Sequence, residues 1–291
     1  MDRDSLKSFV TLSECGSFSR AAELLYITQP AVSKRIAALE QLLDAKLFDR
    51  IGKRVQLTHA GSILLPKALQ ILADINEATR AVTDLTGEVR GDLHVATSHH
   101  IGLHKLPPVL RAFAARYPKV NLRFEFLDSE IACERVLQGK CELALVTLPP
   151  QTLAPLIATP LWHDPLVFVT GLPSEIPAQC SLQTLSQHPA ILPDMNTYTG
   201  QLVQRFFASH GLTLNVSMAT NFLETIKMLC SVGLGWSVLP ASMIDAQIKI
   251  IDVPATLLTR DLGLICHSAR SLSRSGQAFV TCLNENTPKA P

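Results

Sequence analysis

An apolar stripe in residues 28–43 is the pattern that most restricts how this chain folds. The stripe consists of Val32, Ile36, Leu39 and Leu43. Steps of four, three and four residues place these side chains on one side of an α-helix. Thr28 is positioned to cap this helix, and Pro30 falls in its first turn, where backbone N–H groups have no helical partners. We therefore expect a helix that buries one side and exposes the other.

Two short helical segments precede this helix. Apolar residues from Leu6 to Leu12 form the first amphipathic pattern, which Gly16 and Ser17 end. Ser19 is positioned to cap a second helix that runs to Leu25. Two short helices, a tight turn and a third helix with one buried side indicate a helix-turn-helix.

The exposed side of the third helix is small, polar and mildly basic. It carries Pro30, Lys34, Ala37, Ala38 and Gln41, with Gln29, Ser33 and Arg35 at its flanks. Small side chains let a helix enter the major groove of DNA, where Gln and Ser bond base edges while Lys and Arg hold phosphates. An ordinary solvated helix face has the same composition, so this surface alone leaves both interpretations open.

The segment after this helix adds positive charge. Gly52 permits a tight turn, and Val55 and Leu57 alternate as in a short strand, which predicts a basic hairpin beside the helix. Between Thr28 and Thr58 the chain holds six basic and three acidic residues, although its formal net charge is only +1. The positive charge is therefore concentrated where a phosphate backbone would lie.

Three short motifs within residues 16–61 are the most specific signal in the chain. They read Gly16-Ser17-Phe18-Ser19-x-Ala21-Ala22-x-x-Leu25, then Thr28-Gln29-Pro30-Ala31-Val32-Ser33-x-x-Ile36-x-x-Leu39-Glu40, then Leu47-Phe48-x-Arg50 with Leu57-Thr58-x-Ala60-Gly61. This region resembles the DNA-binding domain of LysR-type transcriptional regulators. One departure is Asp44, where the family usually has glycine; Asp tolerates the left-handed conformation in which such a helix can end.

The resemblance implies a winged helix-turn-helix over residues 1–58, with the helix-turn-helix itself at about 18–37. The residues expected to contact DNA are Ser17, Gln29, Pro30, Ser33, Lys34, Arg35, Arg50, Lys53 and Arg54. Among them, Gln29, Ser33 and Lys34 are expected to face the major groove. The three basic residues of the hairpin are expected to hold flanking phosphates.

Residues 59–87 carry a heptad pattern. Its members are Leu64, Ala68, Ile71, Ile75, Ala78, Val82 and Leu85. Alternating steps of four and three produce a narrow seam that suits pairing with another helix, although packing within one chain is an alternative. The resemblance implies the family's linker helix, which pairs two subunits, and it suggests tetramers built from two dimers. The sequence alone supports only dimerisation.

From Gly91 onward, short apolar runs alternate with amphipathic helices in two series. This order predicts an α/β region with largely parallel sheets and two lobes, like those of periplasmic binding proteins. We place the first lobe at about 91–161 and 266–291, and the second at about 162–265. Ligands bind at the carboxyl ends of strands in open α/β sheets, so the cleft between the lobes is the expected site.

Polar residues follow several predicted strands of this region and are candidates for binding a small effector. They are Thr97, Ser98, His99, His100, Ser129, Thr147, Asn196, Thr197 and Tyr198, with Asp128 and Asn221 beside them, and the apolar Phe222 is a further candidate. Hydroxyls and N–H groups at a strand-to-helix junction suit a carboxylate or another small anion. Helix capping and ordinary turn chemistry are the alternatives.

Other chemistry finds little support. His99, His100 and His104 cluster without Cys or a carboxylate beside them in the sequence, so we expect no metal site. The chain contains no G-x-S-x-G, H-E-x-x-H or Walker motif, which argues against an enzyme, and we expect no cofactor. Seven scattered cysteines, and no apparent secretion signal or membrane span, predict a soluble cytoplasmic protein.

These observations predict a LysR-type transcriptional regulator that a small polar or anionic effector controls. The expected partners are double-stranded promoter DNA, the effector and further copies of the chain, with RNA polymerase as an additional partner and no membrane. The alternative is a cytosolic solute-binding protein with the same lobes and no role on DNA. The sequence does not identify the effector or the promoters.

Overall fold

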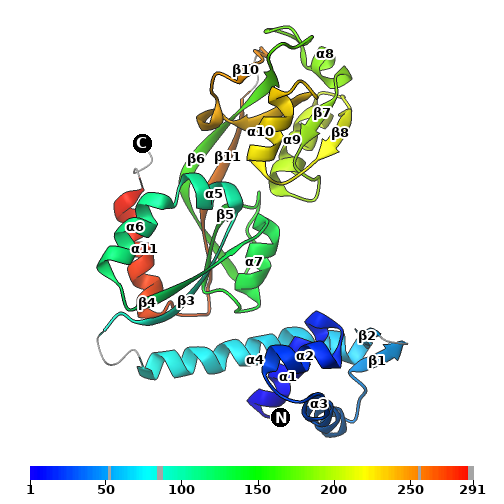
Figure 1. The fold of residues 1–291 in the computed structure, drawn as a ribbon, viewed down its shortest axis with the longest axis vertical. Helices are drawn as coiled ribbons and strands as arrows, with labels where there is room; N and C mark the ends of the chain where they lie inside the picture. Colours follow the sequence, from blue (N-terminus) through cyan, green and yellow to red (C-terminus); the bar gives the residue numbers. More distant parts are fainter. Residues whose placement is uncertain (52–53, 84–87, 255–256, 288–291) are drawn as a thin grey trace. The chain divides into compact units, whose positions relative to one another are not determined.

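The computed structural model describes residues 1–51, 54–83, 88–254 and 257–287. Its internal contacts divide the chain into two compact units (Figure 1). The N-terminal unit comprises Met1–Gly87 with Gln138–Lys140, and the C-terminal unit comprises Glu88–Leu137 with Cys141–Pro291. Among the described residues, no helix combines the length and hydrophobicity that crossing a bilayer requires.

The N-terminal unit consists of three packed helices, a hairpin and a long helix. Its elements are α1 (Arg3–Cys15), α2 (Phe18–Leu25), α3 (Gln29–Leu43), β1 (Phe48–Ile51), β2 (Arg54–Leu57) and α4 (His59–Thr83). Strands β1 and β2 are antiparallel, with Phe48 opposite Leu57. This arrangement is the expected helix-turn-helix followed by a hairpin wing.

The start of α2 differs from the prediction. Gly16 ends α1 with a left-handed φ of 61°, which leaves Ser17 extended immediately before the helix. The side chain of Ser17 therefore reaches the backbone N–H of Arg20 at 3.4 Å and caps α2. The prediction of Ser19 as the cap was wrong because Ser19 already lies within the helix.

The apolar side of α3 forms most of the predicted stripe. Val32, Ile36 and Leu39 are buried in the core of the unit, whereas Leu43 is 40% exposed. The core follows α3 only as far as Leu39, so the last turn projects past it, and the inclusion of Leu43 was wrong. Asp44 adopts the left-handed conformation at the end of the helix, with φ of 47°.

The heptad residues of α4 fall into two groups. Leu64, Ala68 and Ile71 pack against the core of their own unit, and Ala68 is completely buried there. Ala68 therefore faces its own chain and is not on the exposed seam that the heptad predicted. Ile75 is half-buried, Ala78 and Val82 are exposed, and Leu85 lies outside the described residues.

The C-terminal unit is a sheet covered by helices on both faces (Figure 1). Its elements are β3 (Gly91–Thr97), α5 (His99–His104), α6 (Pro107–Arg116), β4 (Val120–Phe126), α7 (Ser129–Leu137), β5 (Leu143–Thr147), β6 (Leu156–Gly171), α8 (Leu182–Gln187), β7 (Ala190–Leu192), α9 (Tyr198–Ser209), β8 (Val216–Ala219), α10 (Leu223–Ser231), β9 (Trp236–Pro240), β10 (Ile248–Ile250), β11 (Leu258–His267) and α11 (Arg274–Asn286), with a short 3-10 turn at Ala241–Met243.

The strands join in the order β4-β3-β5-β11-β6-β9-β7-β8, with β10 also paired to β6. Strands β4, β3 and β5 are parallel in the first lobe, as are β9, β7 and β8 in the second. The long strands β6 and β11 are antiparallel to each other and to their neighbours, and they connect the two lobes. The expectation of largely parallel sheets therefore holds within each lobe and is wrong for this connection.

Alternating side chains supply a core on each face of the sheet, because successive residues of a strand point to opposite faces. In the first lobe, Val95 and Leu145 face α6 and α11, whereas Ala96 and Ala144 face α7. In the second lobe, Phe168 and Trp236 pack against α9, and the opposite face packs against α10. The helices thereby leave the carboxyl ends of the parallel strands open between the lobes.

Candidate functional site

A pocket of about 300 Å³ lies between the two lobes of the C-terminal unit. Its lining comes from residues at or just after the carboxyl ends of β3, β4, β5, β7 and β8, together with one residue of β11. The polar lining residues are Ser98, His99, His100, Asp128, Ser129, Glu130, Thr147, Thr197, Tyr198, Thr199, Asn221 and Arg260. Apolar side chains from both lobes, including Phe126 and Phe222, complete the lining.

Most of the predicted effector-binding residues line this pocket. Those present are Ser98, His99, His100, Ser129, Thr147, Thr197, Tyr198 and Phe222. Thr97 is absent because it is buried and its hydroxyl donates to the carbonyl oxygen of Leu145 at 3.0 Å. Asn196 is absent because it lies in the exposed turn before α9, where its N–H donates to Asp194. Neither residue is therefore among the side chains that line the pocket.

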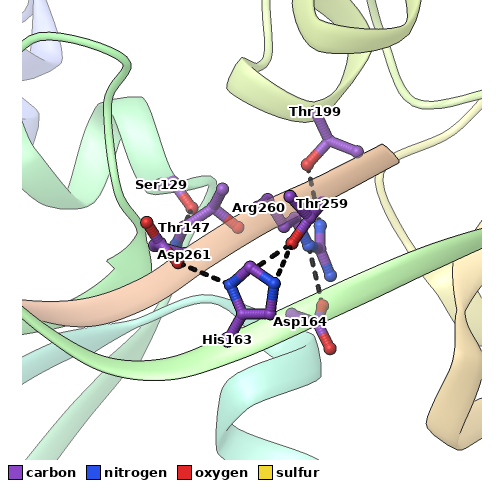
Figure 2. Close-up of polar contacts among 8 residues, drawn as sticks. All are labelled: Ser129, Thr147, His163, Asp164, Thr199, Thr259, Arg260 and Asp261. Atoms are coloured by element: carbon purple, nitrogen blue, oxygen red, sulfur yellow. Dashed lines mark hydrogen bonds and ion pairs between the residues drawn. The ribbon is translucent and has the colours of Figure 1, made fainter. Parts of the chain in front are cut away.

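Arg260 on β11 is one of several pocket residues that the sequence reasoning missed; Glu130 and Thr199 are the other polar ones. Its side chain is only 7% exposed, and it lies opposite Asp164 of β6, which is 3% exposed. Nε donates to Asp164 at 2.9 Å and Nη1 donates to the hydroxyl of Thr199 at 2.7 Å (Figure 2). Nη2 is buried and has no hydrogen-bond partner among the described residues. Burial lowers the pKa of Arg260 and Asp164 opposes this shift, so the guanidinium remains charged.

Hydroxyl groups near Arg260 differ in how far they are already bonded. Ser129 and Thr147 are buried, and Ser129 accepts a hydrogen bond of 3.0 Å from the Thr147 N–H (Figure 2). Thr197 caps α9 by accepting from Gly200, as the capping alternative predicts. Ser98 occupies the corresponding position before α5, but its side chain makes no capping bond. The hydroxyl of Ser98 is therefore not committed to the helix.

The histidines after β3 occupy different environments. His100 is 6% exposed, and neither of its ring nitrogens has a partner among the described residues. Burial, reinforced by the positive charge of Arg260, lowers the pKa of His100 to about 3, so its imidazole is neutral near pH 7. His99 is more exposed and packs edge-on against the rings of Phe126 and Phe222.

The acidic residues of the pocket already accept hydrogen bonds across the lobes. Asp128 in the first lobe accepts from the side-chain amide of Asn221 in the second at 2.8 Å. Glu130 accepts from the backbone N–H of Tyr198 in the same way, and burial raises the pKa of Glu130. The groups left over in the pocket include the donor Nη2 of Arg260, which suits a small ligand that offers acceptor oxygens.

The exposed side of α3 in the N-terminal unit presents part of the predicted DNA-binding set. Gln29, Pro30 and Lys34 are exposed, and the Gln29 amide donates to Ser33 at 3.0 Å on the same side of the helix. Arg35 is instead half-buried and forms a 2.7 Å ion pair with Asp4 of α1. Its guanidinium therefore ties α3 to α1.

The remaining predicted DNA contacts lie at the start of α2 and in the wing. Ser17 uses its side chain to cap α2. Arg50 is in β1, directly opposite Val55, and Arg54 is in β2, directly opposite Ile51. Lys53 lies outside the described residues.

Comparisons with known proteins match both units. Residues 86–288 match the family model of the LysR substrate binding domain, and residues 4–62 match that of the bacterial regulatory helix-turn-helix protein, lysR family. An HTH-type transcriptional regulator of Azotobacter vinelandii is 58% identical over 108 residues, covering 37% of this chain and 75% of that protein.

Two further similarities extend over nearly the whole chain. A probable RuBisCO transcriptional regulator of Nostoc sp. is 30% identical over 95% of this chain and 86% of its own. The solved structure of a full-length OxyR variant from Pseudomonas aeruginosa is 21% identical, covers 99% of this chain and 97% of its own, and superposes with a TM-score of 0.68. This structure supports the fold.

Proposed function

Because this chain belongs to the LysR family of transcriptional regulators, we propose that its pocket binds a small molecule carrying a carboxylate or a similar anionic group. Members of the family bind promoter DNA through the helix-turn-helix and an effector through the substrate-binding domain. The helix-turn-helix match disfavours the alternative, a solute-binding protein without a role on DNA.

The observation that carries this proposal is the buried Nη2 of Arg260, which has no hydrogen-bond partner within the described ranges of the chain. An unsatisfied donor on a buried cation costs free energy, and an anionic oxygen of a ligand would satisfy it. Asp164 and Thr199 already fix the plane of the guanidinium, so its free edge is held in one orientation. Ser98, Ser129 and Thr147 add hydroxyls to the same pocket.

On the DNA side, Gln29, Ser33 and Lys34 are proposed to lie in the major groove, with the wing along the flanking phosphates. The exposed apolar residues of α4 pair two chains into a dimer, and two dimers form a tetramer. The proposed pocket binds and releases its ligand unchanged, without catalysing a reaction. A protein that acts on bacterial promoters works in the cytoplasm, where the DNA lies.

The test is a panel of small mono- and dicarboxylates, each paired with its neutral primary amide. A ligand that binds the folded state raises the melting temperature, and the rise grows with the logarithm of the ligand concentration divided by its Kd. We expect one or more carboxylates to stabilise the wild type while their amides do not. Arg260→Lys keeps the positive charge but removes the planar guanidinium with its paired N–H donors. The affinity for that carboxylate should fall about tenfold or more, as expected when one charge-assisted hydrogen bond is lost.

Arg205→Lys is the matched control, because Arg205 is exposed on α9 and does not line the pocket. It should leave carboxylate binding unchanged. Amides that bind as well as carboxylates, or full affinity in the Arg260→Lys variant, would show that the anchor lies elsewhere.

A further inference from the structure

His100, His104 and Glu224 converge at the edge of the pocket from opposite lobes. The two histidines are four residues apart on α5 of the first lobe, whereas Glu224 lies in the first turn of α10 in the second. One potential ligand atom from each of the three residues lies within 4.8 Å of the other two. The sequence separates Glu224 from His104 by 120 residues, which is why the histidine cluster seemed to lack a carboxylate.

A simple ion pair explains only part of this cluster. The ring of His104 contacts Glu224 with 2.7 Å between Nε2 and Oε1, and His99 lies 3.6 Å from the other carboxylate oxygen. His100 is different. It is only 6% exposed, and neither of its ring nitrogens has a hydrogen-bond partner in the described part of the chain. Buried polar atoms are nearly always bonded. An unsatisfied imidazole beside a second imidazole and a carboxylate therefore indicates that a further group binds here.

We propose that His100, His104 and Glu224 form a binding site for one divalent transition-metal ion such as Zn²⁺. Two imidazoles and one carboxylate are ligands that Zn²⁺ and its neighbours accept, with a fourth position open to water or His99. Bonds of about 2.1 Å would place tetrahedral ligand atoms roughly 3.4 Å apart, so modest side-chain rotations from the observed spacing are sufficient.

The position of this site gives it a structural consequence. An ion held by α5 and α10 together would join the two lobes at the mouth of the pocket, beside the existing contact between Asp128 and Asn221. Metal binding would therefore stabilise the lobe arrangement in which the three residues meet. This inference concerns the C-terminal unit alone and does not depend on the proposed carboxylate ligand.

The experiment measures Zn²⁺ binding to the untagged full chain by equilibrium dialysis, with Co²⁺ absorption as a report on coordination. The variants are His104→Gln and Glu224→Gln, both at partly exposed positions that should tolerate the change. We expect one Zn²⁺ per wild-type chain and about 100-fold weaker Zn²⁺ binding in each variant. Removing a residue that only orients a metal ligand already weakens binding by about 10–100-fold, and removing a ligand itself should weaken it at least as much. Zn²⁺ should also raise the melting temperature of the wild type and not of the variants.

His163→Gln is the matched control, because His163 is exposed, pairs with Asp261 and lies outside the cluster. It should bind Zn²⁺ as the wild type does. The proposal is overturned if the wild type binds no Zn²⁺ in the micromolar range, or if His104→Gln and Glu224→Gln bind it unchanged. Carboxylate binding with no Zn²⁺ binding would leave the proposed function intact while removing this site.

Discussion

At the residue scale, Asp164 and Arg260 form a buried ion pair, so these two positions should tolerate substitution much less than their neighbours do. Asp164→Asn should lower the free energy of unfolding of the C-terminal unit by about 3–5 kcal/mol, because it leaves the Arg260 charge buried without compensation. Denaturant unfolding followed by tryptophan fluorescence reports on this unit alone, since Trp162 and Trp236 both belong to it.

Asp261→Asn is the internal comparison for this prediction. Asp261 is the next acidic residue along the same pair of strands, but its ion pair with His163 is exposed (Figure 2). Exposed ion pairs contribute about 0–1 kcal/mol, so this variant should unfold almost as the wild type does. Similar losses in both variants would argue against a special role for burial.

Glu40 supplies a pH-dependent contribution to the N-terminal unit. Its carboxylate accepts from the backbone N–H groups of Leu47 and Phe48, at 2.9 and 3.4 Å, and from Lys46 at 2.8 Å. Burial alone would raise the pKa of Glu40, but these bonds lower it below its ordinary value. The stabilisation is therefore complete above the unfolded pKa and is lost as the pH falls through the folded pKa.

Glu40→Gln should consequently lower the free energy of unfolding of residues 1–87 by about 1 kcal/mol at pH 7. The difference from the wild type should shrink to zero in acid, where the native carboxyl is protonated. Circular dichroism of this fragment across denaturant and pH measures both effects. Glu23→Gln, at an exposed pair with Arg20, should show no such difference, and a pH-independent gap at Glu40 would exclude the charge as its cause.

At the element scale, the two halves of α4 should respond differently to charge. Ile71→Lys places a charge against the unit's own core and should destabilise the folded chain. Ile75→Lys combined with Val82→Lys should instead abolish dimerisation and affect the unfolding of the N-terminal unit much less than Ile71→Lys, because Val82 is 68% exposed and Ile75 lies outside the buried core. Sedimentation and denaturant unfolding together separate the two outcomes.

Asn76→Lys adds the same charge about 100° around α4 from Ile75. Asn76 is exposed there and accepts a hydrogen bond from Arg3. This variant should leave the dimer intact. If the variant with both Ile75→Lys and Val82→Lys still forms a dimer, the exposed half of the heptad does not form the dimer interface.

A separate prediction concerns the salt dependence of DNA binding through α3. In the major groove Gln29 and Ser33 would bond base edges, while the ammonium of Lys34 would hold a phosphate at the edge of the groove. Lys34→Ala should therefore lower the slope of log K against log salt by about 0.9, the contribution of one phosphate contact. Lys34 is exposed on α3, where DNA could contact it. Lys119→Ala, in the C-terminal unit and paired with Glu88, is the control that should leave the slope unchanged. An unchanged slope at Lys34 would place its contact on a base or off the DNA.

Local periodicity predicted the elements whose apolar residues face a single core. The stripe of α3 and the hydroxyl-bearing ends of β3 and β5 follow from neighbours in the sequence. Strands β6 and β11 were not predicted as a pair, because Pro160 and Pro165 interrupt β6 and charges at Arg260 and Asp261 interrupt β11. A charged residue inside an otherwise apolar run was the available sign that Arg260 is special.

Contacts between distant segments could not be read from the sequence. Arg260 acquires its role only when Asp164 lies opposite it, and the histidines of α5 meet Glu224 only when the lobes are placed together. The order of residues in the sequence does not determine the distance from Arg260 to Asp164 or from the α5 histidines to Glu224. The sequence predicted most of the polar residues that line the pocket, whereas the ion-pair partners of those residues became visible only in the tertiary structure.

At the scale of the whole molecule, ligand and DNA should influence each other's binding equally. If the carboxylate that stabilises the wild type changes promoter affinity, saturating promoter DNA must change carboxylate affinity by the same factor, typically about 5–150-fold. Fluorescence anisotropy for DNA and calorimetry for the ligand measure the two sides of this cycle. A shuffled duplex of equal length is the control, and a factor of one on both sides would contradict coupling.

The ladder between β6 and β11 also determines where this protein can be recombined with its relatives. A chimera that exchanges only the second lobe must cut both strands. If the relative that supplies the new lobe lacks an acidic residue opposite Arg260, the guanidinium stays buried without its ion-pair partner. A cut before Glu88 severs neither strand. Engineers who build biosensors on this scaffold should therefore graft the entire C-terminal unit, and evolution faces the same restriction when it shuffles specificities.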